Sequence, residues 1–133
     1  IMPGYAIVLA SDELEKLTAV STIASVAAAS DIPIDVFVTM NALTAFEHEA
    51  VETKSFNTGP LGEAMLTNED VQIPLFTEQL RQAKEMGPLS LYACTMVMDM
   101  MGRTLDDYID VFDDKLGVAG FLGKAEDKQV IFV

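Results

Sequence analysis

The stretch Leu89-Ser90-Leu91-Tyr92-Ala93-Cys94-Thr95-Met96 predicts how the whole chain folds. Residues 89–93 form a short apolar run, which is typical of a parallel strand covered on both faces. Gly87-Pro88 precedes this run as a turn signal, and Gly102 follows the next eight residues as a helix stop. The stretch therefore predicts a buried strand that leads directly into a helix, with Cys94 at the junction.

Upstream of this stretch, the sequence predicts two further strands, at residues 5–10 and 34–39. A helix between them is expected to begin at an N-cap Ser11 and to run to about Ser30. Residues 40–46 predict another short helix. Residues 48–70 show no clean period and predict a long loop, which in a compact domain is usually functional or mobile. A further helix is expected to start at Pro74 and to stop at Gly87.

Downstream of the cysteine, the sequence alternates again between helix and strand. Thr104-Leu105-Asp106-Asp107 resembles a capping box, and it predicts a helix over residues 104–112. A short strand at 116–119, a short helix at 120–126 and a last strand at 129–133 complete the pattern. Strands that alternate with helices predict a single α/β domain over residues 1–133, with a flavodoxin-like, doubly wound, mainly parallel sheet of about five strands and helices on both faces. In such sheets the functional site lies outside the carboxyl ends of the strands, where Cys94 is expected.

The charge of the chain restricts its partners. The 133 residues include 21 acidic and 8 basic side chains, which gives a net charge of −13. A phosphate backbone or an anionic membrane would be repelled by this field, whereas a basic protein would be attracted. No apolar run is long enough to span a bilayer, and residues 1–4 lack the features of a signal peptide. With a single cysteine and therefore no internal disulfide, we expect a cytoplasmic protein with no membrane insertion.

Cys94 is the strongest candidate for chemistry. At the expected junction, its thiol would face the free N–H groups of the first helical turn, which favour a thiolate. The first carboxylate after Cys94 is Asp99, so no acid already occupies these N–H groups. The alternative is that Cys94 is simply a small buried apolar residue. The absence of a Cys-x-x-Cys motif excludes an internal dithiol cycle.

Other candidate sites carry weaker signals. His48, the only histidine, lies beside Glu47 and Glu49 and cannot be placed near Cys94 from the sequence. A zinc site built from His48, Glu47 and Cys94 would have no recognisable ligand spacing. We therefore expect His48 to be an exposed surface residue and predict no resident metal.

The methionines after the cysteine predict core and interface packing. Two alternatives are a soft apolar lining for the thiol and a copper(I) site, because thiolate and thioether are soft ligands. No glycine-rich loop follows the first predicted strand, so no flavin or dinucleotide is expected, and we predict no cofactor. The methionines concerned are Met96, Met98, Met100 and Met101.

Three segments give the chain a family resemblance. They are Phe37-Val38-Thr39, the segment from Tyr92 to Gly102 around the cysteine, and Gly117-Val118-Ala119-Gly120-Phe121-Leu122. Together with the order of elements, they resemble the DsrE/DsrF-like family. The resemblance implies a flavodoxin-like fold, a homo-oligomer that is commonly a trimer or a hexamer, and a cysteine that carries sulfane sulfur. Only Cys94 fits that role.

The resulting functional expectation is a sulfur-trafficking protein of the sulfurtransferase type. Its Cys94 would bind sulfane sulfur as a persulfide or thiosulfonate and pass it to the reactive cysteine of a small sulfur-carrier protein. A non-catalytic oligomeric binding subunit with a structural Cys94 is the main alternative. A peroxide-reducing thiol ranks last, because the chain has no resolving cysteine. The residues expected to line the anion pocket are Thr95 and Met96, through their backbone N–H groups, and Thr39, Met40 and Asn41.

Overall fold

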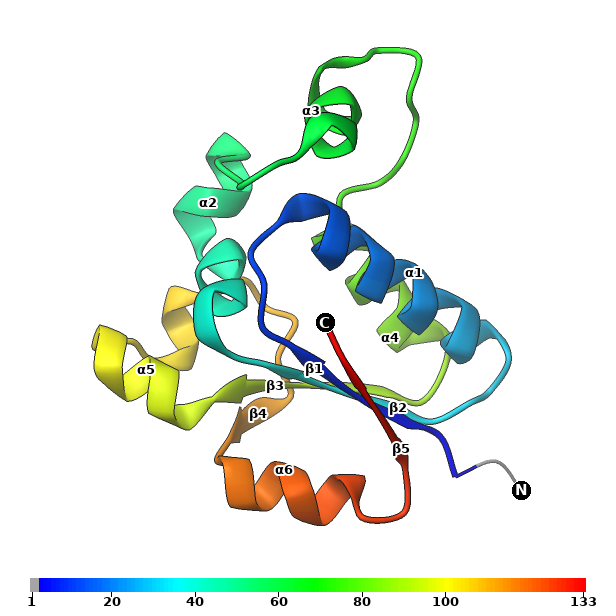
Figure 1. Ribbon diagram of the computed structural model, residues 1–133, viewed down its shortest axis with the longest axis vertical. Helices are drawn as coiled ribbons and strands as arrows, with labels where there is room; N and C mark the ends of the chain where they lie inside the picture. Colours follow the sequence, from blue (N-terminus) through cyan, green and yellow to red (C-terminus); the bar gives the residue numbers. More distant parts are fainter. Residues whose placement is uncertain (1–2) are drawn as a thin grey trace.

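Five parallel strands form one sheet in the order β4-β3-β2-β1-β5 (Figure 1). The computed structural model describes residues 3–133. The predicted α/β, flavodoxin-like architecture with about five parallel strands is therefore confirmed. The strands are β1 (Tyr5–Leu9), β2 (Ile34–Val38), β3 (Leu89–Cys94), β4 (Asp114–Leu116) and β5 (Gln129–Phe132).

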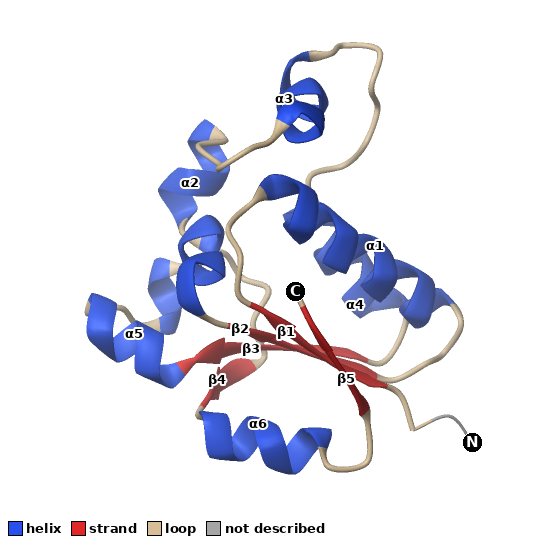
Figure 2. Ribbon diagram, in the orientation of Figure 1, coloured by secondary structure: helices blue, strands red, loops and turns tan. Residues whose placement is uncertain are grey.

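Helices cover both faces of the sheet (Figure 2). On one face lie α1 (Leu14–Ala29) and α4 (Phe76–Met86), which pack against each other, and on the opposite face lies α6 (Val118–Ala125). The short helices η1 (Met40–Phe46), a 3₁₀ helix, and α5 (Thr95–Met101) both stand at the end of the sheet where β2 and β3 stop. The doubly wound arrangement therefore places η1 and α5 beside Cys94, as the sequence predicted.

The core is built around register partners of the three central strands. Ile7, Val36 and Leu91 lie side by side across β1, β2 and β3, and all three are completely buried. On the face that α6 covers, the ring of Phe121 stacks on Phe37 with 4.8 Å between the ring centroids. This face has one covering helix, whereas the other has two. Among residues 3–133, no helix combines the length and the apolar character needed to cross a membrane.

Residues 48–70, which we predicted to be a long loop, contain two short helices. They are α2 (His48–Thr53), which ends at the left-handed Lys54, and α3 (Pro60–Thr67), which has Pro60 in its first turn. The prediction was wrong because helices of six and eight residues are shorter than the window in which a helical period shows. In Figure 1, α2 and α3 and the connection to α4 form an arm beyond the first turn of α1.

Several element boundaries differ from the sequence prediction. Helix α1 begins at Leu14, because Ser11 is not its cap: the Ser11 hydroxyl accepts a hydrogen bond from the Glu13 N–H at 3.1 Å. Helix α4 begins at Phe76, two residues after Pro74. Strand β4 ends at Leu116, and Val118 and Ala119, which were predicted to be strand, open α6.

Outside the arm, the largest difference between prediction and structure concerns the helix expected over residues 104–112. The capping box at Thr104 and Asp107 exists, but it opens only η2 (Leu105–Asp107), a single 3₁₀ turn. After this turn, the Ile109 N–H donates to the Phe46 carbonyl at 2.9 Å instead of continuing a helix. Tyr108 and Val111 are buried in the core from this irregular segment. Tertiary contacts therefore replaced the helix that the local pattern predicted.

Candidate functional site

Cys94 lies where the sequence placed it, as the last residue of β3 and the N-cap of α5. Its partner across the β3–β4 pair is Leu116. Because Val38 pairs with Ala93 on the other side, Thr39 and Cys94 leave the sheet at the same level. Helix α5 ends at Gly102, whose left-handed backbone (φ 64°) fits the predicted stop. The carboxyl ends of β2, β3 and β4 thus surround the thiol.

The expected accessibility of the thiol is not found. Cys94 is completely buried in the single chain, with 0% of its surface exposed. Within the described chain, its sulfur makes no capping hydrogen bond to the first turn of α5. That helix is seven residues long. The prediction that the thiol contacts the first-turn amides and is open to solvent is therefore wrong for this structure.

The five expected pocket residues share one end of the sheet, but they do not form a closed pocket. Thr39 is buried, and its backbone N–H donates to the Leu9 carbonyl at 2.9 Å. Met40 is about half exposed and adopts a left-handed backbone with φ 50°. Asn41 and Met96 are also exposed, and Thr95 is half-buried. The structure thus places Thr39 level with the cysteine, and it exposes Met40, Met96 and Asn41 to solvent.

A cavity that the sequence did not indicate lies one helical turn from Cys94. Its volume is about 390 Å³, and Met98, which is buried four residues after the cysteine, forms part of its wall. Arg103 and Lys115 bring the two positive charges of this cavity, and Asp99 and Asp106 bring negative ones. The sequence held one indication of this cavity: Arg103 and Lys115 are the only basic residues between Lys84 and Lys124. Because the two residues lie far apart in the sequence, the sequence did not show that they line the same cavity.

A second polar cluster forms beside η2. The Glu47 carboxylate pairs with the Arg103 guanidinium at 3.0 Å, and the His48 Nε2 lies 2.9 Å from the Asp106 carbonyl. Tyr108 is almost fully buried, and burial, followed by the negative charge of Glu47, raises the pKa of its phenol, against the opposing effect of Arg103. His48 is thus exposed, as predicted, and it hydrogen-bonds to the chain.

The sequence of the chain is similar to one known protein family. The model of the DsrE/DsrF/DrsH-like family matches residues 56–133, which is more than half of the chain and includes Cys94. The chain belongs to this family. Family membership indicates a sulfur-related role, and it confirms the resemblance seen in the sequence. The chain matches no curated protein.

In this DsrE/DsrF/DrsH-like chain, the side chains of the alternative zinc site do not come together. Among residues 3–133, no three His, Cys, Asp or Glu side chains are gathered as metal ligands. His48 and Glu47 are engaged with Asp106 and Arg103, as described above. The zinc alternative built from His48, Glu47 and Cys94 is therefore not formed.

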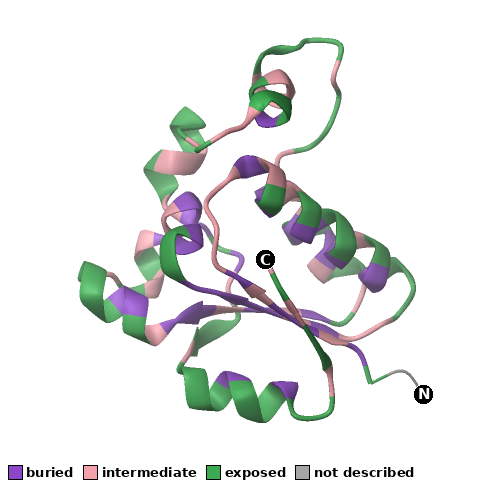
Figure 3. Ribbon diagram, in the orientation of Figure 1, coloured by how far each residue is buried: buried purple, intermediate pink, exposed green. Residues whose placement is uncertain are grey.

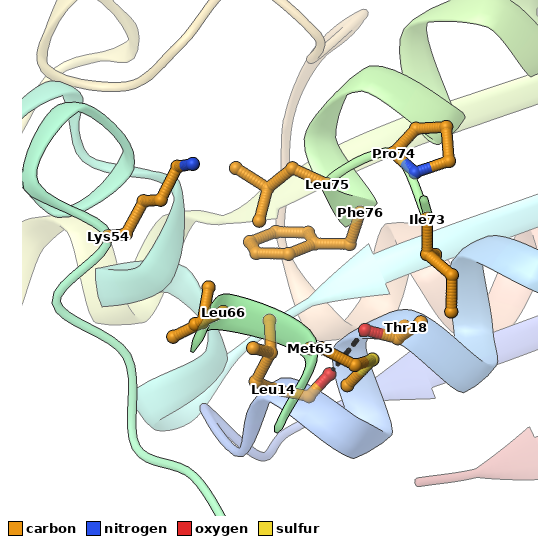
Figure 4. Close-up of a pocket in the computed structure, with 9 residues that line it drawn as sticks. All are labelled: Leu14, Thr18, Lys54, Met65, Leu66, Ile73, Pro74, Leu75 and Phe76. Carbon is orange, nitrogen blue, oxygen red and sulfur yellow. Dashed lines mark hydrogen bonds between the residues drawn. The ribbon is translucent and has the colours of Figure 1, made fainter. Parts of the chain in front are cut away.

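The family match also contains α3 and its connection to α4, and a cavity separates α3 from the body of the protein (Figure 4). Met65 and Leu66 of α3 face Leu14 of α1 and Phe76 of α4 across a space of about 70 Å³. The arm is held by Glu15, whose carboxylate accepts a hydrogen bond from the Gly59 N–H at 3.1 Å. Backbone hydrogen bonds from Gly62 and Gly59 lower the pKa of Glu15.

Proposed function

We propose that the protein is a sulfur carrier of the DsrE/DsrF/DrsH-like family and that Cys94 holds the transferred sulfur. The observation that carries the proposal is the position of this residue. The only cysteine of the chain is the last residue of a parallel strand, at the carboxyl ends of the strands where α/β proteins place their functional sites, and it lies inside the segment that matches the family.

The proposed chemistry needs no cofactor. The Cys94 thiolate attacks the sulfane sulfur of a polysulfide or a similar donor, and a new bond forms between Sγ and that sulfur. The sulfur–sulfur bond of the donor breaks, and its electron pair leaves with the remainder of the donor. In the second step, the thiolate of a partner cysteine attacks the outer sulfur of the persulfide, and Cys94 leaves as a thiolate. Both steps are exchanges at sulfur, so no external oxidant or reductant is consumed.

Burial of Cys94 requires that the site opens. Helix α5 has seven residues, and only Val97 and Met98 of these are buried, so few apolar contacts oppose its displacement. When α5 shifts, the thiol becomes accessible, and the backbone N–H groups of Thr95 and Met96, which have no partner within the helix, can bind the anion, while Thr39, Met40 and Asn41 line the opposite side. In the closed conformation the bound sulfur is shielded from water and oxidants.

The partner that fits this chemistry is a small carrier protein with a reactive cysteine of its own. A net charge of −13 favours a basic contact surface on that partner. We place this exchange in the cytoplasm, where thiols remain reduced. The homo-oligomeric state of the protein is part of the same proposal.

The second candidate function is a non-catalytic binding subunit in which Cys94 only packs. The observation in its favour is the complete burial of Cys94 together with the missing sulfur–amide hydrogen bond. In this case the exposed methionines of α5 would act as a contact surface. The two candidates differ in whether a native chain takes up sulfur.

Mass spectrometry after polysulfide treatment separates the two candidates. Because Cys94 is the only cysteine, any added sulfur on a thiol reports on this site, and Cys94→Ser is the blank. We expect the native chain to gain sulfur, to gain it faster in Val97→Ala, where α5 is loosened, and to lose it to a thiol acceptor. Met101→Ala, an exposed change on the same helix, is the control and should leave the rate unchanged. A native chain that stays unmodified while the unfolded chain reacts would establish the binding subunit instead.

A further inference from the structure

The cavity that adjoins α5 and β4 is lined by charged side chains of both signs. It has a volume of about 390 Å³, and its walls come from the C-terminal half of α5, from η2 and from β4. Asp99 and Asp106 bring carboxylates, and Arg103 and Lys115 bring a guanidinium and an ammonium group. We call it the α5–β4 cavity. Most of α5 and the whole of β4 are exposed or half-buried (Figure 3), so a ligand can reach the cavity from solvent.

The opposite charges of this cavity do not pair with each other. Lys115 makes no ion pair with any side chain of residues 3–133, and neither does Asp99 or Asp106. Lysine and aspartate side chains that line one cavity without contact leave space between them for a ligand. Three charged groups therefore face the α5–β4 cavity with their electrostatic interactions unused by the protein.

Arg103 is held at one end of its guanidinium group only. One Nη donates to the Glu47 carboxylate at 3.0 Å, which balances the charge of the arginine. The Nε–H is buried and has no acceptor within the described residues. Buried donors without an acceptor are rare in folded proteins, and each one calls for an explanation such as a bound polar group. Arg103 thus keeps hydrogen-bonding capacity that no protein group uses.

The balance of charge around the cavity selects the class of ligand. Because Glu47 balances Arg103, one free ammonium group, that of Lys115, stands against the free carboxylates of Asp99 and Asp106. A simple anion such as thiosulfate would be repelled by the carboxylates, and a simple cation would be repelled by Lys115. The zwitterion of an α-amino acid satisfies both signs through charge-assisted hydrogen bonds. The volume of the cavity is within the range of about 300–1,000 Å³ that is usual for small-molecule sites.

Two walls of the cavity come from residues next to the thiol. Met98 is buried in one wall and lies one helical turn after Cys94, which is about 5.4 Å along the helix axis. Lys115 directly precedes Leu116, the register partner of Cys94. Methionine is unbranched and flexible, so Met98 can move aside. An amino acid that is bound by its α-groups can therefore direct its side chain toward the Cys94 Sγ when α5 shifts.

We propose that the α5–β4 cavity binds the α-ammonium and α-carboxylate groups of an amino-acid persulfide, such as cysteine persulfide, and that this molecule supplies the sulfur to Cys94. The inference rests on the function proposed above. Lys115 and Arg103 bind the carboxylate, and Asp99 and Asp106 bind the ammonium group. The Cys94 thiolate attacks the outer sulfur of the donor. The bond from Sγ to this sulfur forms while the sulfur–sulfur bond of the donor breaks, and free cysteine leaves as a thiolate that takes a proton from water.

An NMR titration of the Cys94→Ser chain tests binding without sulfur transfer. The probe is S-methyl-L-cysteine, a stable zwitterion. The comparison ligands are 3-(methylthio)propionate, which lacks the ammonium group, and 2-(methylthio)ethylamine, which lacks the carboxylate. We expect the zwitterion to bind at least about tenfold more tightly than either, and Lys115→Gln and Asp99→Asn each to weaken it about tenfold. Lys16→Gln removes the same charge from an exposed position of α1, and as the matched control it should leave the Kd unchanged.

Loading rates with two sulfur donors separate this inference from the function on which it rests. Mass spectrometry follows the loading of Cys94 from cysteine persulfide and from inorganic polysulfide, which has no α-groups. We expect Lys115→Gln to slow loading from cysteine persulfide about tenfold relative to Lys16→Gln, and to leave loading from polysulfide nearly unchanged.

Two results would overturn the inference. One is equal binding of the three probe ligands, or no binding of S-methyl-L-cysteine. The other is an equal effect of Lys115→Gln on both donors. A native chain that takes up sulfur from neither donor but still binds S-methyl-L-cysteine would overturn the proposed function and the donor role, whereas the zwitterion site itself would stand.

Discussion

Cys94 and Leu116 are register partners at the carboxyl ends of β3 and β4. Partners on adjacent strands project their side chains to the same face within a few ångströms of each other. Leu116 is half-buried and therefore stands between the thiol and the solvent on the β4 side. In the proposed function, access to the sulfur then depends on α5, which follows Cys94, and on Leu116 beside it.

Truncation of Leu116 should expose the thiol without displacing α5. We expect Leu116→Ala to raise the rate at which a thiol reagent alkylates Cys94 in the native chain, at a cost of about 1 kcal/mol in stability. Leu122→Ala on α6 is the control, because Leu122 is exposed and is not a partner of Cys94. Equal alkylation rates in the two variants would show that Leu116 does not shield the sulfur.

The sequence predicted the position of Cys94 because the information is local. An apolar run, a turn signal before it and Gly102 after it define β3 and α5 within sixteen residues. The burial of Cys94 was not predictable in this way, because it depends on residues from other strands, such as Leu116. The cavity with Arg103 and Lys115 was missed for the same reason, since β4 brings Lys115 back to α5 only in the folded chain.

The arm gives a prediction about pH. Hydrogen bonds from the Gly62 and Gly59 N–H groups lower the pKa of Glu15 below its usual 4.5. A lowered pKa in the folded state stabilises the protein above the unfolded pKa, and this contribution is lost as the pH falls through the folded value. We therefore expect Glu15→Gln to unfold more easily than the parent at neutral pH, with the difference disappearing on acidification below 4.5. Urea unfolding at a series of pH values measures this difference.

Two further variants check that the effect belongs to the hydrogen bonds of the arm. A methyl group at position 62 would occupy the place of the Glu15 carboxylate, so Gly62→Ala should reproduce the loss seen in Glu15→Gln at neutral pH. Glu85→Gln, an exposed change on α4, should show no such dependence on pH. If Glu85→Gln and Glu15→Gln behaved alike, general charge repulsion would explain both.

A close approach of two helix ends makes Gly87 irreplaceable by alanine. A Cβ atom at Gly87 would lie 2.8 Å from the Ala28 Cα, and this backbone cannot move aside as a flexible side chain would. We expect Gly87→Ala to lower the free energy of unfolding by about 2–3 kcal/mol. Gly123→Ala is the matched control: the space around Gly123 in α6 is open, and alanine there should stabilise the helix by up to about 1 kcal/mol. Denaturant unfolding that shows no loss for Gly87→Ala would mean that α1 and α4 separate easily.

The buried phenol of Tyr108 leads to a prediction about the stability of the protein at alkaline pH. Burial and the charge of Glu47 raise the pKa of its phenol above the usual 10.0. Above pH 10 the unfolded chain therefore releases the Tyr108 proton before the folded chain does, and the folded state loses stability as the pH rises toward the folded pKa. Tyr108→Phe keeps the ring on Phe112, 5.8 Å between centroids, and removes the proton. We expect the parent to lose more stability than Tyr108→Phe between pH about 8 and about 11 in urea unfolding, with Tyr5→Phe as the control. A parallel decline in the parent and Tyr108→Phe would show that the phenol ionises equally in both states.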